Sequence, residues 1–246
     1  MGVREWWRKV WFVLWKDDSP LSIIISFVVA FLLIQYVFYP GLGLLLGTEY
    51  PVVAVISGSM EHRANLGCSE YENIAGDIPR QRCPENSLVP MICGVEVNRT
   101  GRVSFDEFWS LCGAWYEREG IAKGAFAQFP FPRGFDTGDI MVLRRADDIR
   151  IGDVIVFEGR TPEPIIHRVI DVTKTDRGTV YSTKGDHNAG QIISYQNLVV
   201  GEGTVRVPII DERSINEAQV VGKAWFRIPW LGYPKLWLTR IMGAFR

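Results

Sequence analysis

The sequence has almost equal numbers of positive and negative side chains, few histidines, and no strong enrichment in proline or glycine. Its 27 basic and 28 acidic side chains leave a net charge of −1. A general nucleic-acid-binding protein would carry an excess of basic residues, so this class is excluded. Thirteen prolines and 24 glycines in 246 residues are too few for a collagen-like chain. Together with a mean hydropathy of +0.05, these averages describe an ordinary soluble protein of one or two domains.

Charge is missing altogether from one stretch near the N-terminus. The 19 residues 21–39 contain no Asp, Glu, Lys, Arg or His, and a helix of that length roughly matches the ~30 Å hydrocarbon core of a bilayer. Pro20 suits a first helical turn, and Pro40 is expected to stop the helix. The sequence therefore predicts a transmembrane helix over 21–40. A buried core helix or a cleaved secretory signal fits the length and flanks less well.

The bases around this span predict its orientation. Four bases precede it, and no Lys or Arg follows it until Arg63. The positive-inside rule then places the N-terminus in the cytoplasm and the rest of the chain outside the cell membrane, with a single pass. The preceding bases are Arg4, Arg8, Lys9 and Lys16.

Seven of the nine tryptophans gather in residues 6–15 and 225–237. The first group alternates with bases, so residues 1–20 are expected to form an interfacial segment at the cytoplasmic headgroups. Charged residues and prolines interrupt the stretch that holds the second group, so the sequence predicts no second membrane-spanning helix there. We expect 223–246 to be an aromatic and basic membrane-interface segment, with a buried strand at a sheet edge as an equal alternative.

Short β-branched runs separated by turn residues dominate the chain after Gly138. They lie at 139–143, 154–157, 165–172 and 180–183, with further strands expected at 198–200 and 204–207. A similar run lies at 50–58. This spacing predicts a mainly β fold, with a small antiparallel or barrel-like core formed by 41–60 and 138–222.

Residues 61–137 differ in composition and are expected to form an inserted, partly helical subdomain. A capping box and aromatics at helical spacing predict a helix over 104–119. All four cysteines lie in this insertion, and in an extracytoplasmic segment they could form two disulfides by any of three pairings. A structural zinc site is the weaker alternative because there is no Cys-x-x-Cys. The cysteines are Cys68, Cys83, Cys93 and Cys112.

The candidate nucleophile is Ser59, which follows the first expected strand. A serine hydroxyl needs a neighbouring base to take its proton and donors to stabilise the oxyanion. Only three histidines are available. His62 is too close in sequence to reach back easily, and His187 lies in a turn. His167 lies within an expected strand, a rigid place for a base, although such a histidine is more often a core residue.

Five short segments appear in an order that resembles the type I signal peptidases. The resemblance is to the archaeal and endoplasmic-reticulum branch, in which histidine replaces the lysine base of most bacterial relatives, and it covers roughly 21–221. The segments are Ser57-Gly-Ser-Met-Glu61, Gly138-Asp-Ile-Met-Val142, Gly152-Asp-Val-Ile-Val-Phe157, His167-Arg-Val169 and Lys184-Gly-Asp-His-Asn188.

The resemblance implies a membrane-anchored serine endopeptidase with a β-rich signal-peptidase-like domain. Ser59 matches the nucleophile, His167 the general base and Asp186 the acid. The Ser57 hydroxyl and the Ser59 backbone N–H would form the oxyanion hole. This chemistry needs no metal or cofactor. The reaction implied is removal of N-terminal signal peptides from secreted and membrane precursors.

The chain departs from the family pattern at two places. His62 stands where members often have proline. A second acid, common five or six residues after the first, is replaced by Gln191 and Ile192. Either Asp186 alone orients the base, or another acid such as Asp211 reaches in. We favour Asp186.

An extended substrate is expected to add as a strand between 52–57 and 163–166. Val53, Val55, Ser57 and Ile165 are the expected substrate-binding residues. The expected partners are signal-peptide-bearing precursors, the lipid bilayer and the secretion translocon, with no nucleic acid. Two alternatives remain. One is a non-catalytic assembly subunit of the same fold, and the other is a Ser/Lys hydrolase with Lys184 as its base.

Overall fold

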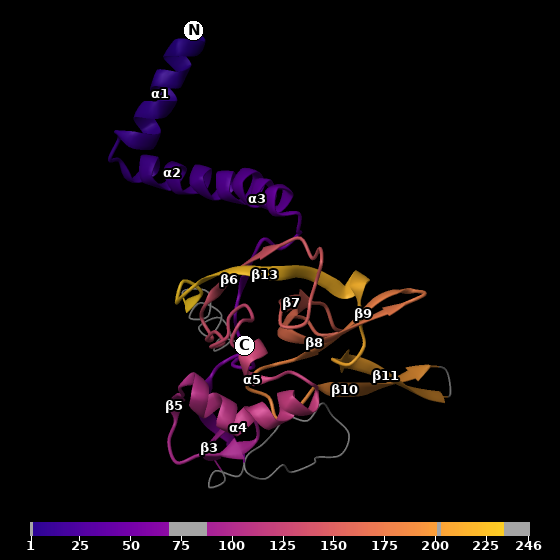
Figure 1. Ribbon diagram of the computed structural model, residues 1–246. Coiled ribbons are helices and arrows are strands. Elements are labelled where there is room, and N and C mark those ends of the chain that lie inside the picture. The colour runs from indigo at the N-terminus through magenta and orange to yellow at the C-terminus, as the bar shows by residue number, and fades with distance from the viewer. Residues whose placement is uncertain (1, 69–87, 201–202, 234–246) are drawn as a thin grey trace. The chain divides into compact units, whose positions relative to one another are not determined.

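The structure, a computed structural model, describes residues 2–68, 88–200 and 203–233 (Figure 1). The chain divides into two compact units, Met1–Pro51 and Val52–Arg246. The first is helical. The second holds the strands of a mainly β fold, as the sequence predicts.

The N-terminal unit contains α1 (Val3–Trp15), α2 (Pro20–Leu33) and α3 (Tyr39–Leu46), with a π-helical turn at Ile34–Phe38 between the last two. Helix α2 begins where Ser19 accepts a hydrogen bond from the Ser22 backbone N–H at 3.3 Å, with Pro20 in the first turn. From Pro20 to Leu46 the helix is long and apolar enough to cross a membrane.

The prediction that Pro40 stops this helix is wrong, because the helix continues to Leu46 and ends at Gly47 with φ 67°. A proline lacks a donor and its ring crowds the carbonyl four residues earlier. For Pro40 that carbonyl belongs to Tyr36, which lies within the π turn. The wider turn accommodates the ring at this point, so the apolar helix extends beyond the predicted limit of 40.

The second unit is built on a curled seven-stranded antiparallel sheet of order β1-β6-β13-β7-β8-β9-β12 (Figure 1). A separate hairpin pairs β10 with β11. In sheet order the strands are β1 (Val52–Ala54), β6 (Ile140–Arg144), β13 (Val220–Ile228), β7 (Val154–Phe157), β8 (Ile165–Thr175), β9 (Gly178–Lys184) and β12 (Ile215–Asn216), and the hairpin is β10 (Ile193–Val200) and β11 (Gly203–Asp211).

Strand β7 shows why the sheet holds together. Its four residues are all buried, and alternation sends Val154 and Val156 to one face and Ile155 and Phe157 to the other. Each pair enters a different apolar cluster. A strand covered on both faces is a continuous apolar run, and burial of each such side chain contributes about 1.5–3 kcal/mol.

The insertion contains more strand than the sequence predicts. Four strands form a small sheet of order β4-β3-β2-β5, and two helices follow it. The N-cap prediction is confirmed, since Ser104 accepts from the Glu107 backbone N–H at 3.2 Å. The elements are β2 (Arg63–Cys68), β3 (Leu88–Ile92), β4 (Val95–Glu96), β5 (Gly101–Arg102), α4 (Phe105–Arg118) and α5 (Lys123–Phe126).

The predicted core boundary at 222 falls inside β13, which is a central strand between β6 and β7. A β-bulge between Ala224 and Phe226 breaks the alternation, so Trp225 and Phe226 are both exposed, at 58% and 57%. The start of the expected interface segment is therefore part of the core sheet. Residues 234–246 lie outside the described residues, and the interfacial role of the segment stays a prediction.

The cysteines of the insertion are oxidised where the structure describes them. Cys93 and Cys112 form a disulfide with Cα atoms 5.6 Å apart, joining the end of β3 to α4. Cys68 is also disulfide-bonded, and Cys83 lies outside the described residues. Because two of the four thiols are joined to each other, the zinc alternative loses half of its ligands.

Candidate active site

Ser59 lies on a tight turn just after β1. Beside it the Met60 side chain is completely buried, and the Met60 carbonyl accepts from the Phe135 N–H at 3.1 Å. The Ser59 side chain remains partly accessible, and its Oγ lies 3.2 Å from the Ser57 Oγ. The two hydroxyls that the sequence assigns to nucleophile and oxyanion hole are thus neighbours.

His167 lies on β8 opposite Ile155 of β7 and is 2% exposed. Its Nδ1 forms a hydrogen bond with the Glu212 carboxylate. Its Nε2 faces the nucleophile segment, since a Cβ added at Gly185 would lie 2.8 Å from that Nε2 and 2.8 Å from the Ser59 carbonyl oxygen. The structure therefore brings His167 Nε2 and the Ser59 main chain close to the same residue, Gly185.

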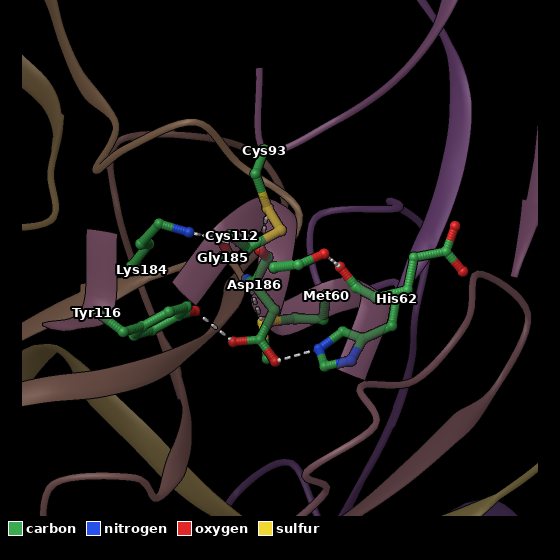
Figure 2. Close-up of a disulfide and its surroundings, with 10 residues drawn as sticks. Met60, His62, Cys93, Cys112, Tyr116, Lys184, Gly185 and Asp186 are labelled. Carbon is green, nitrogen blue, oxygen red and sulfur yellow. Dashed lines mark hydrogen bonds and ion pairs between the residues drawn. A yellow bond between two sulfur atoms is a disulfide. The ribbon is translucent and has the colours of Figure 1, made fainter. Parts of the chain in front are cut away.

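Asp186 is fully buried, but it serves a different set of partners. It accepts from Arg168 at 2.9 and 2.7 Å, from the Tyr116 hydroxyl at 2.9 Å and from His62 Nε2 at 3.1 Å. Tyr116 and His62 reach its carboxylate from different sides (Figure 2). Burial alone would raise the pKa of Asp186, but the Arg168 charge and the His62 hydrogen bond outweigh it and lower this pKa.

The expectation that Asp186 orients His167 is not what the described residues show. Successive residues of a strand point to opposite faces, so His167 and its neighbour Arg168 cannot turn to the same carboxylate. Arg168 donates hydrogen bonds to Asp186, whereas His167 is hydrogen-bonded to Glu212. Asp211, the alternative acid, accepts instead from the backbone and side chain of Arg213.

Arg168 is the residue that holds Asp186 in place. Its guanidinium is fully buried, and all five of its N–H donors are used, on Asp186 and on the carbonyls of Pro130, Phe131 and Gly152. Sequence reasoning missed this role. The signal was available, because a charged residue beside His167 in an apolar strand needs a buried partner.

His62 is a second residue that the sequence reading undervalued. Its ring stacks on Phe108 of α4 at 3.5 Å with an 8° interplanar angle, and its Nε2 meets Asp186. Burial lowers the pKa of His62, and the Asp186 charge only partly offsets this. The departure from proline at this position therefore connects the nucleophile turn to the insertion.

Lys184 faces away from the base. Alternation along β9 directs Thr183 towards Glu212, with 3.0 Å between Oγ1 and Oε1, and Lys184 to the other face. The Lys184 amine donates to the Gly185 carbonyl at 3.0 Å (Figure 2). It also lies over the rings of Trp115 and Tyr116. Burial lowers the pKa of Lys184 to about 8. These contacts favour a structural amine over a base for Ser59.

The expected substrate-binding residues divide into two groups. Val53 on edge strand β1 and Ile165 at the start of β8 are partly exposed, and Ser57 is exposed. Val55 does not fit the role, because it is 2% exposed in the core and its N–H and C=O already bond to Asp139 and Gly138. Within residues 2–68, 88–200 and 203–233, no three His, Cys, Asp or Glu side chains are grouped to hold a metal ion.

Comparison with known proteins finds similarity to signal peptidases. The chain is 34% identical over 112 residues to the signal peptidase complex catalytic subunit SEC11 of Lachancea thermotolerans, covering 43% of this chain and 58% of that protein. It is 35% identical over 126 residues to rat SEC11C, covering 45% and 59%. It is 34% identical over 58 residues to signal peptidase I W of Bacillus subtilis, covering 22% and 30%.

These matches span less than two thirds of the length of the relatives. No protein-family model matches the chain.

Proposed function

The chain is related to the type I signal peptidases of the endoplasmic-reticulum type, and from that relationship we propose that it is a membrane-anchored serine endopeptidase. Its substrates are precursors that carry N-terminal signal peptides. The observation that carries the proposal is the approach of both His167 Nε2 and the Ser59 segment to Gly185. A partly accessible serine and a buried, oriented imidazole that approach the same glycine are the components that acyl transfer requires.

The reaction follows from these positions. The Ser59 Oγ attacks the carbonyl carbon of the scissile peptide bond while His167 Nε2 takes the hydroxyl proton. The Ser59 N–H and the Ser57 hydroxyl donate to the resulting oxyanion. The C–N bond breaks as His167 gives its proton to the leaving amine. A water molecule, deprotonated by His167, then releases the acyl group, and the proton returns to Ser59.

Substrate recognition uses exposed strand edges and the bilayer. Val53 lies on β1, an edge strand, and Ile165 lies where β8 is paired with β7 but not yet with β9. An extended cleavage region can add to such edges through main-chain hydrogen bonds. The apolar helix Pro20–Leu46 would hold the enzyme where signal peptides leave the bilayer, which raises their effective concentration.

We also propose the placement and partners of the chain. Positive residues before the apolar helix favour a cytoplasmic N-terminus and an extracytoplasmic second unit. Two of the relatives are named as subunits of a signal peptidase complex. Association with such a complex, and with the secretion translocon that delivers precursors, is therefore part of the proposal.

The test is cleavage of a secretory precursor by the full chain in liposomes, with the new N-terminus read by mass spectrometry. Ser59→Ala and His167→Ala are each expected to lose on the order of 10⁴-fold or more in kcat. Lys184→Met is the matched control for the Ser/Lys alternative and should keep most of the activity. Normal cleavage by His167→Ala, or loss confined to Lys184→Met, would reject the Ser59–His167 pair.

A further inference from the structure

The residue that orients His167 stands outside the motifs that mark this site. Glu212 follows β11 directly and is separated from His167 by 45 residues. It is completely buried. A buried carboxylate is costly unless donors surround it, so its partners reveal what it does.

Three donors converge on the two carboxylate oxygens of Glu212. His167 Nδ1 and the Thr183 hydroxyl meet Oε1, the latter at 3.0 Å, and the Ile192 backbone N–H meets Oε2. The main chain is held as firmly. The Glu212 N–H donates to the Ile192 carbonyl at 3.1 Å, and its own carbonyl accepts from the Thr183 N–H at 2.8 Å. A side chain fixed by this many bonds presents its oxygen to the imidazole in one orientation.

The position of these donors explains the departure from the family pattern at 191 and 192. Gln191 donates its amide to the Glu212 carbonyl at 3.2 Å, and Ile192 donates its N–H to the carboxylate. Gln191 and Ile192, which replace the second acid of the family pattern, are thus residues that hydrogen-bond to Glu212. A carboxylate from the end of β11 occupies the place beside the base.

We propose that Glu212 is the positioning residue of the catalytic base, completing a Ser59–His167–Glu212 triad. This rests on the proposed function. The carboxylate accepts the Nδ1 proton of His167, which leaves Nε2 unprotonated and aimed at the nucleophile, and it stabilises the imidazolium formed when Ser59 attacks. Glu212 itself takes no proton. Asp186, bound to Arg168, anchors the loop that carries Gly185.

The kinetic experiment compares Glu212→Gln with Asp211→Asn in the full chain. Asp211 is a matched control because it is the adjacent acid, partly exposed and bonded to Arg213. Glu212→Gln is expected to lower kcat by on the order of 10³–10⁴-fold with little change in KM, and to move the acid limb of the pH profile to lower pH. Asp211→Asn should behave as wild type. A Glu212→Gln enzyme with near wild-type kcat would overturn the proposal.

A spectroscopic measurement reads the His167 tautomer in the wild-type protein and needs no activity. The chain has only three histidines, so ¹⁵N-histidine labelling yields three imidazoles, and His167→Gln identifies the one of interest. We expect a strongly deshielded proton on its Nδ1 in the wild-type protein. A His167 protonated on Nε2 alone would overturn the proposal. If the wild type shows the Nδ1 proton but cleaves no precursor, the peptidase function fails while the Glu212–His167 contact stands.

Discussion

Gly185 leaves no room for a side chain between its neighbours in the site. A Cβ there would lie 2.7 Å from Asn188 Nδ2 and 2.8 Å from both His167 Nε2 and the Ser59 carbonyl oxygen. Real Cβ atoms do not approach neighbours so closely, so one of these groups would have to move. The absence of a side chain at Gly185 is what allows His167 to face the Ser59 turn.

We therefore expect Gly185→Ala to separate base and nucleophile and to lower kcat by on the order of 10²-fold, the typical result of a displacement near 1 Å. Gly190→Ala is the control in the same loop, because its Cβ would meet only Trp115 Nε1 at 3.8 Å. Kinetics on a synthetic precursor measure both variants. Equal rates for the two would contradict the role of Gly185.

Lys184 gives the second unit a pH dependence. Burial lowers its pKa to about 8, from 10.5, so between these values the unfolded chain binds a proton that the folded chain does not. Stability from this group therefore rises with pH across that window, by up to about 1.4 kcal/mol per pH unit. The substitution Lys184→Met removes this pH-dependent contribution to the free energy of unfolding. The thermal midpoint in detergent, measured from pH 8 to pH 10, should rise in the wild type relative to Lys184→Met. A constant difference between the two midpoints over this range would contradict the lowered pKa of Lys184.

At the scale of elements, the insertion acts as one side of the site. Cys93 donates its N–H to the His187 carbonyl at 2.8 Å, and the His187 N–H donates to the Ser59 carbonyl at 2.8 Å. From α4, Tyr116 binds Asp186. The disulfide joins these two contributors, so the insertion braces the loop that carries Gly185 and Asp186 (Figure 2).

Removal of this disulfide is expected to loosen that brace. The bond closes a loop of 19 residues, for which chain entropy gives about 3 kcal/mol. Cys93→Ser/Cys112→Ser should lower the thermal midpoint and reduce kcat more than KM. Reductant added to the double variant isolates any contribution of the disulfide at Cys68. An unchanged midpoint and rate would show that α4 is held by packing alone.

At the scale of the whole molecule, the two units differ in the surroundings that their composition suits. The N-terminal unit suits a lipid bilayer and the second unit suits water. The first carries a helix whose 18-residue window has a mean hydropathy of 2.5. The second is a β unit whose buried residues form three apolar clusters. The near-neutral composition of the chain is the sum of both. Averaged numbers hide this division because hydropathy acts on local stretches.

Local patterns were enough to predict much of the fold and part of the site. Strand β7 matches its predicted limits because a short apolar run between turns has no other stable use. The helix after Ser104 is confirmed because its cap and its aromatic spacing are local signals. The four strands of the insertion were missed, since two of them are only two residues long.

The sequence by itself determined the apolar helix and the β-rich unit, because length, charge and strand periodicity are properties of neighbouring residues. Ser59 and His167 were assigned from the five short segments that resemble the type I signal peptidases. Only the tertiary structure decided which acid contacts His167. Alternation along β8 turns His167 and Arg168 to opposite faces, and Glu212 arrives from 45 residues away. A hydrogen bond between such distant residues depends on how the strands are ordered in space, which local spacing does not encode.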